Sequence, residues 1–163
     1  MATQIIRFLN IIMVALVTGT IFGIWLGFNP IGLSAQTYIE QQQNNIRALN
    51  TIMPLLGLIT IVLTLISAFL RKKEKGAFIL LLVATVFLII SGLTTKFGSQ
   101  PINSVVMTWD MNMPPDNWTS LRDQWWTYHI IRTSTAIIAL CLIVWTGMKK
   151  DEKNINTANK ELI

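Results

Sequence analysis

Four long apolar stretches alternate with polar segments along the chain. They cover about residues 8–28, 49–70, 77–95 and 128–148. Each is long enough to cross the hydrocarbon core of a bilayer, about 30 Å thick, as an α-helix that rises about 1.5 Å per residue. The pattern therefore predicts an all-α membrane protein whose single domain, residues 1–163, is a bundle of four transmembrane helices.

The composition supports a location in the membrane. Of the 163 residues, 52% are hydrophobic and 13% are charged, whereas about 25% of the residues in an ordinary soluble domain are charged. The net charge of +5 is not spread over one face, as nucleic-acid binding would require. The basic residues gather instead at the ends of the apolar stretches. We therefore expect the lipid bilayer as a partner, and no nucleic acid.

The basic residues also predict the orientation, because segments rich in lysine and arginine remain in the cytoplasm. Arg7 precedes the first stretch, residues 71–75 connect the second to the third, and residues 149–163 follow the fourth. We expect both termini to be cytoplasmic, in a bacterial cytoplasmic membrane, with residues 149–163 as a cytoplasmic tail. The outer loops are then residues 29–48 and 96–127.

The second and fourth helices are predicted to extend beyond the bilayer. Residues 36–50 contain no helix breaker before Pro54, which should kink the second helix near the interface. Pro114-Pro115-Asp116-Asn117 is a stop followed by an N-cap candidate. From there the fourth helix can run to Met148, over about 48 Å. We expect the two extensions to form a small extracytoplasmic helical cap.

The segments that enter these two helices resemble each other. Residues 45–50 align with residues 120–125, which pairs Arg47 with Arg122. This similarity suggests an internal repeat of two hairpins.

A glycine ladder runs along the first helix. Gly19, Gly23 and Gly27 recur every four residues, a spacing that lets helices approach closely in lipid. The ladder predicts a tight helix contact, either within the bundle or between the subunits of a homo-oligomer.

The entry to the fourth helix is unusually polar and aromatic. At about 100° per residue, one narrow stripe of this helix carries Trp118, Arg122, Trp125, His129 and Arg132. Charged groups inside a membrane are costly and usually face the interior of a bundle, which favours a pocket. The alternative is an aromatic belt at the membrane interface, with an arginine that extends back to the head groups.

A second stripe lies on the second helix. It carries Gln43, Arg47, Asn50, Pro54 and Gly57. If both stripes face the bundle axis, they meet near the outer leaflet and form a pocket for a small hydrophobic or aromatic ligand. Arg47 and Asn50 are the candidate substrate-binding residues on this helix.

The candidate catalytic residues are His129, Arg132 and Arg122. The imidazole can accept a proton as a general base, and the guanidinium groups can hold an anionic oxygen. We expect no metal site, because the chain's one histidine and one cysteine do not make a coordination sphere. A haem held by His129 and a methionine such as Met53 is an alternative.

The motifs of several other functional classes are absent. Because Cys141 is the single cysteine, disulfide chemistry of the Cys-x-x-Cys kind is excluded. The sequence has no phosphate-binding glycine loop, no nucleophile elbow and no His-Glu-x-x-His pair. It also lacks the series of intramembrane carboxylates that is typical of ion transport.

Several short motifs occur in a fixed order between about residues 11 and 144. They are Phe28-Asn29-Pro30, Leu49-Asn50-x-x-Met53-Pro54, Pro101-Ile102-Asn103, Trp109, Trp118, Leu121-Arg122-x-x-Trp125 and His129-x-x-Arg132-Thr133. In this set the chain resembles the anthrone-oxygenase-like family of small four-helix membrane proteins, much of which is still a domain of unknown function. Asn29 and Asn103, which lie in these motifs, complete the candidate substrate-binding residues.

The resemblance implies a monooxygenase that uses dioxygen as co-substrate and needs no cofactor. His129 would then remove a proton from a carbon acid, and Arg132 and Arg122 would stabilise the enolate oxygen. Trp118 and Trp125 would stack on a flat aromatic substrate. The alternative is a non-catalytic protein that binds a lipid, quinone or other hydrophobic ligand, or a membrane partner subunit.

Overall fold

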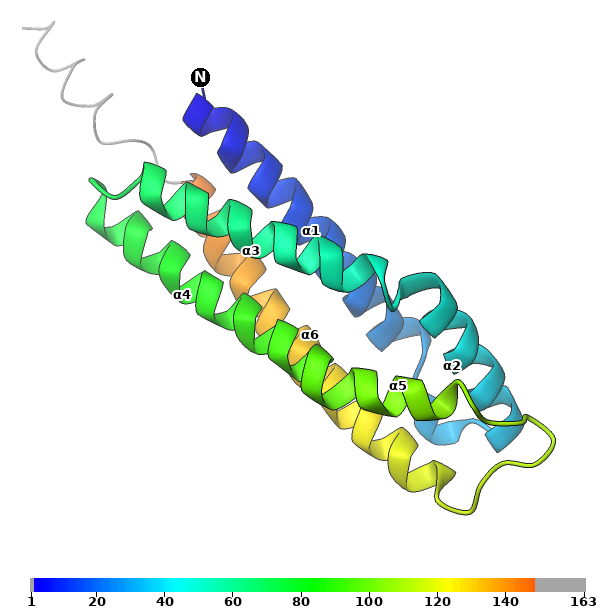
Figure 1. Ribbon diagram of the computed structural model, residues 1–163. Helices are drawn as coiled ribbons and strands as arrows, with labels where there is room; N and C mark the ends of the chain where they lie inside the picture. Colours follow the sequence, from blue (N-terminus) through cyan, green and yellow to red (C-terminus); the bar gives the residue numbers. More distant parts are fainter. Residues whose placement is uncertain (1, 149–163) are drawn as a thin grey trace, which may run out of the picture.

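The fold is a bundle of four long helices (Figure 1). The computed structural model describes residues 2–148. The four helices are α1 (Ala2–Gly27), α3 (Ile52–Leu70), α4 (Lys75–Leu93) and α6 (Trp118–Met148). Each packs against two others in the cyclic order α1, α3, α4, α6, and each lies in a segment long and apolar enough to cross a membrane. The predicted all-α membrane bundle is confirmed, whereas the predicted tail, residues 149–163, lies outside the described residues.

Shorter helical elements gather at the end of the bundle away from Ala2 and Met148 (Figure 1). They are η1 (Pro30–Gly32), α2 (Ala35–Leu49) and α5 (Gln100–Val106). Together with the first turns of α6 they enclose a core that is rich in aromatic rings. We call this end the distal end, and the end where α1 begins and α6 ends the terminal end.

The second predicted helix is divided into α2 and α3, which meet at an angle (Figure 1). The division falls at Asn50 and Thr51. Pro54 has no N–H to donate to the Asn50 carbonyl, and the next bond, from the Leu55 N–H to the Thr51 carbonyl, is long at 3.4 Å. The proline therefore explains the bend, close to where the sequence predicts a kink.

The third helix is longer than the sequence suggests. After α4 the chain continues through a π-helical turn, η2 (Thr94–Ser99), directly into α5, so the segment predicted as an outer loop from residue 96 is helical as far as Val106. A Cβ built on Gly98 would lie 2.6 Å from the Tyr128 ring of α6. The glycine therefore permits η2 and α6 to approach closely where the π-turn occurs.

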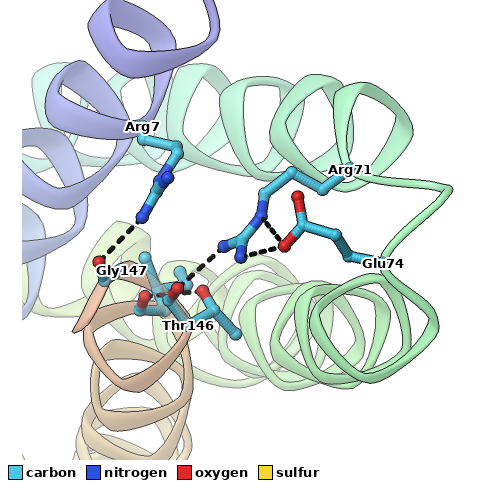
Figure 2. Close-up of polar contacts among 6 residues, drawn as sticks. Arg7, Arg71, Glu74, Thr146 and Gly147 are labelled. Carbon is cyan, nitrogen blue, oxygen red and sulfur yellow. Dashed lines mark hydrogen bonds and ion pairs between the residues drawn. The ribbon is translucent and has the colours of Figure 1, made fainter. Parts of the chain in front are cut away.

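At the terminal end, two arginines bind the last turn of α6 (Figure 2). Arg71 follows α3, and its side chain is buried. It donates to the Thr146 carbonyl at 2.7 Å and forms an ion pair with Glu74 at 2.5 Å. Arg7 donates to the Gly147 carbonyl, also at 2.7 Å. Because the last carbonyls of a helix lack partners within it, these bonds fasten α6 to α1 and to the α3–α4 connection.

The outer surface of the bundle is apolar. Large hydrophobic side chains remain exposed on all four helices, as expected for contact with lipid. Gly19, Gly23 and Gly27 lie on this surface, and a Cβ built on any of them meets no other atom within 4 Å. The glycine ladder therefore makes no close contact within the described bundle, and its role between subunits stays a prediction.

Candidate functional site

The only histidine lies at the centre of the distal end. His129 is fully buried. Its ring stacks on Trp125, with centroids 5.1 Å apart, and on Trp126, at 5.4 Å. The three side chains meet because residues three and four positions apart on α6 share one face. The predicted stripe therefore points into the protein and not toward lipid.

Arg132 binds the His129 ring from one turn further along α6. Its Nε donates to Nδ1 at 3.0 Å, and a terminal guanidinium nitrogen lies 2.6 Å from the same atom. Because arginine only donates, Nδ1 accepts, and the proton of the neutral ring is on Nε2. Nε2 has no hydrogen-bond partner among residues 2–148, although the Ile21 backbone of α1 lies near the ring.

Arg132 forms no ion pair with a carboxylate in the part of the chain that the structure describes. Its guanidinium lies over the Trp125 ring, 5.5 Å from the centroid. A cation inside a membrane protein is usually paired. A charge held only by an imidazole and an indole face is therefore suited to an anionic or strongly polar ligand oxygen.

A partly open cavity of about 50 Å³ lies next to this arginine. Its wall is formed by α1, α2, the start of α3, η2, α5 and α6, and it includes Arg132 and Trp125. His129 does not line it, but contacts both of these residues. We call this space the distal cavity. It has room for a few water molecules as it stands, so a fused aromatic ligand would have to widen it or lie partly in its mouth.

Amide side chains supply the polar wall of the distal cavity. Gln42 donates to the Asn103 side-chain oxygen at 3.2 Å, and Asn103 donates to that of Asn50 at 2.9 Å. All three line the cavity. The network joins α2, α5 and the α2–α3 bend, so it holds the bend in place and makes this side of the cavity wall polar.

The structure brings together five of the predicted site residues. Four of them line the distal cavity: Trp125, Arg132, Asn50 and Asn103. The fifth, His129, is hydrogen-bonded to Arg132 but does not line the cavity. Asn50 and Pro54 of the predicted stripe on the second helix thus line the same cavity as Trp125 and Arg132 of the α6 stripe, whereas the role of this cavity as a ligand site stays a prediction.

Two further predicted residues on α6 lie outside the cavity wall. Arg122 donates to Asp123 at 2.9 Å and to the Ile31 carbonyl at 3.3 Å, and its guanidinium lies 4.9 Å from the centre of the Trp118 ring. Trp118 also packs on Tyr38. Arg122 and Trp118 thus join α6 to η1 and α2, away from the cavity.

The two remaining predicted residues are exposed. Arg47 donates to Asn44 and Gln43 on the surface of α2, and Asn29 accepts from the Ile31 N–H as the N-cap of η1. Neither reaches the distal cavity. Since Arg47 is exposed and Arg122 is buried, the proposed repeat pairs residues in different environments, and it stays a prediction.

Gln42, a buried residue of α2, lines the cavity and was not predicted as part of the site. Tyr38 lies one turn earlier, and burial raises the pKa of its phenol more than nearby Arg122 lowers it, so its hydroxyl stays protonated at neutral pH. A stripe through Tyr38, Gln42, Ile46 and Asn50 has helical spacing, but the run of amides from Gln41 to Asn45 hides which face is buried.

The sequence profile of a family described as anthrone oxygenase matches residues 44–142. The chain belongs to the anthrone oxygenase family. No curated protein and no solved structure matches the chain. Asn50, Asn103, Trp125, His129 and Arg132 all lie within the segment that matches the anthrone oxygenase family, whereas α1 and Gln42 precede it.

Proposed function

We propose that this member of the anthrone oxygenase family is a membrane-embedded monooxygenase that acts on a small aromatic carbon acid without a cofactor. The observation that carries the proposal is the Arg132–His129 pair at the distal cavity, where a cation without a carboxylate partner lies beside an imidazole. These are the two groups needed to form an enolate: one that accepts a proton and one that stabilises the negative oxygen.

The reaction converts an activated CH₂ group and dioxygen into a carbonyl and water. The base takes one proton, and the electron pair of the C–H bond is delocalised onto the substrate oxygen beside Arg132. One electron passes to dioxygen, and the resulting carbon radical and superoxide couple to form a C–O bond. The peroxide is protonated by the base. Loss of the second C–H proton then breaks the O–O bond, which leaves the carbonyl, and the departing hydroxide becomes water.

In this scheme Arg132 controls the basicity of His129. Arg132 covers the Nδ1 lone pair, and Nε2 carries the ring proton, so the unliganded ring has no free acceptor. When a ligand oxygen draws the guanidinium toward the cavity, Nδ1 becomes free to take the substrate proton. Proton abstraction is thereby coupled to binding of the oxygen that will carry the charge.

Trp125 supports a flat substrate in the same proposal. Its ring is buried, lines the cavity and stacks on His129. An aromatic ligand that enters beside it gains an offset stacking contact. Trp118 and Arg122, which lie outside the cavity, act on this site only through the packing of η1 and α2 against α6.

A second candidate function is non-catalytic binding of a quinone, lipid or other hydrophobic molecule, or of a membrane partner subunit. The small volume of the cavity and the covered Nδ1 atom favour it. In that case His129 acts only as the partner that holds Arg132 toward the ligand. We also propose that both termini are cytoplasmic, since Arg7 and Arg71 bind the last turn of α6 at the terminal end and Lys72 follows Arg71 in the chain.

Oxygen uptake by the purified protein with anthrone as probe separates the two functions. Replacement of His129 by alanine should lower the rate by about 10²–10⁴-fold, the usual contribution of a general base. The Tyr128→Phe variant, which changes the neighbouring side chain outside the cavity wall, is the matched control and should keep the wild-type rate. Equal rates for His129→Ala and wild type would exclude His129 as the base.

A further inference from the structure

Two polar atoms in the wall of the distal cavity have no partner. The amide oxygen of Gln42 and the indole N–H of Trp125 form no hydrogen bond to any of residues 2–148. Their side chains are 1% and 3% exposed, and both line the cavity. A buried polar group left without a hydrogen bond costs about 1–3 kcal/mol, so a partner from beyond residues 2–148 would stabilise both atoms.

The amide network determines which atom of Gln42 is left over. Because Asn103 donates to Asn50 through its NH₂ group, its oxygen is the atom that receives the bond from Gln42. Gln42 must therefore use its own NH₂ group there, and its oxygen remains as an acceptor. The residues that line the cavity thus include one with an unpaired acceptor, Gln42 on α2, and one with an unpaired donor, Trp125 on α6.

We infer that Gln42 is a specificity-determining residue, whose amide oxygen accepts a hydrogen bond from a hydroxyl group of an aromatic ligand in the distal cavity. The same ligand places a second oxygen near the Trp125 N–H and Arg132. The ligand class is therefore a hydroxylated aromatic, a phenol, and not a bare hydrocarbon. This inference rests on the proposed function only because it uses the same cavity. The role of Gln42 holds for a bound ligand whether or not that ligand reacts.

Gln42 acts separately from the groups that would do the chemistry. It lies on α2, whereas His129 and Arg132 lie on α6. It also precedes residues 44–142, the part of the chain that matches the family profile. Changing Gln42 should therefore alter which ligand binds without altering how the Arg132–His129 pair acts on it.

Gln43 provides a matched control on the same helix. It is buried like its neighbour, but its NH₂ group donates to the Val106 and Trp109 carbonyls, at 3.0 Å each. It is not part of the cavity wall. A Gln43→Met variant loses structural bonds and should lose stability, while its ligand preference should stay unchanged.

The test compares 1-naphthol with 1-fluoronaphthalene, which have similar shapes but differ in the ability to donate a hydrogen bond. Dissociation constants are measured by titration calorimetry on protein in lipid nanodiscs, with protein-free nanodiscs subtracted. Wild-type protein should prefer 1-naphthol by about three- to tenfold, the factor that one net hydrogen bond supplies. Gln42→Met should reduce this ratio to about one, and Gln43→Met should keep it.

Two results would overturn the inference. One is an unchanged ratio in Gln42→Met, which would mean that only water satisfies the Gln42 oxygen. The other is equal binding of both probes by wild-type protein, a result that needs no variant and so applies even if Gln42→Met does not fold. Oxygen uptake by wild-type protein is measured separately. If Gln42→Met abolishes the preference for 1-naphthol but the wild type takes up no oxygen, the role of Gln42 is supported and the oxygenase function is rejected. If the wild type takes up oxygen but Gln42→Met keeps the preference, the oxygenase function is supported and the role of Gln42 is rejected.

Discussion

Each end of the bundle contains an arginine that points into the protein, and the two differ in burial and in their partners: Arg71 is buried and Arg132 is half-buried. At the terminal end, Arg71 has a carboxylate, Glu74, and the Thr146 carbonyl (Figure 2). At the distal end, Arg132 has only the His129 ring and the Trp125 face among the described residues. Removing a cation from water is costly unless it is paired. The paired arginine therefore serves the fold, and the other is the one to which we assign a ligand in the proposed function.

The same contrast extends to the surrounding polar groups. Around Arg71, the hydrogen bonds link helices to each other and close the last turn of α6, and Ser67 Oγ is the unpaired buried atom among the residues that line the small pocket there. Around Arg132, the unpaired atoms of Gln42, Trp125 and His129 lie together at or beside one cavity. Buried polar groups in native proteins are nearly always paired, so three unpaired atoms around one cavity call for a partner from beyond the described residues.

The largest expected loss of stability is at the paired arginine. Breaking a buried ion pair by removing one partner costs about 3–5 kcal/mol. Arg71→Met should lower the free energy of unfolding by about 3 kcal/mol, at the low end of this range, because Glu74 is 33% exposed and can regain water. The free energy of unfolding, measured by denaturant titration in detergent, checks this. Lys72→Met, at the exposed neighbouring position, should stay within about 0.5 kcal/mol of wild type. A similar small change for Arg71→Met would contradict the structural role.

The next largest loss of stability is expected at the π-helical turn, η2, of the distal end. Gly98→Ala places a Cβ against the Tyr128 ring, 2.6 Å away, and the strain should cost about 1–3 kcal/mol. Because η2 leads into α5, the same change should also weaken binding of 1-naphthol in the distal cavity. The control is Gly92→Ala in α4, where a new Cβ meets no atom within 4 Å. If both variants bind the probe equally well, the close approach at Gly98 does not position the cavity.

The smallest expected change in stability is at the other arginine. Arg132 is half-buried and has no carboxylate partner among the described residues, so Arg132→Met leaves no buried charge behind without its partner. We expect a free energy of unfolding equal to or above that of wild type. A loss as large as that of Arg71→Met would remove the distinction between the two ends.

Much of the fold can be predicted from the sequence, because the bilayer imposes strong constraints. A spanning segment must be long, apolar and helical, so the hydropathy pattern alone predicts the four helices. The inward face of α6 is also predictable, because Trp125, His129 and Arg132 share one stripe of a helix whose other faces are apolar or exposed.

The rotation of α2 and the length of the third helix depend on tertiary contacts. Gln41 to Asn45 are all amides, so polarity does not reveal that Gln42 is buried and Arg47 is exposed. Gly98 and Pro101 suggest a loop by composition. The helix nevertheless continues there: the glycine accommodates the Tyr128 ring, and the proline directly follows the π-helical turn, within the first two positions of α5.

The most direct test of whether the distal end is the functional site is the rate of oxygen uptake with anthrone. The rate is compared between wild type and Arg132→Met in the same lipid vesicles. Removal of one group that stabilises a developing oxyanion lowers turnover by about 10²–10³-fold. We predict uptake by wild type with formation of the corresponding quinone, and a loss of that size in a folded Arg132→Met protein. Uptake at the wild-type rate by Arg132→Met, or no uptake by wild type above protein-free vesicles, would contradict the assignment.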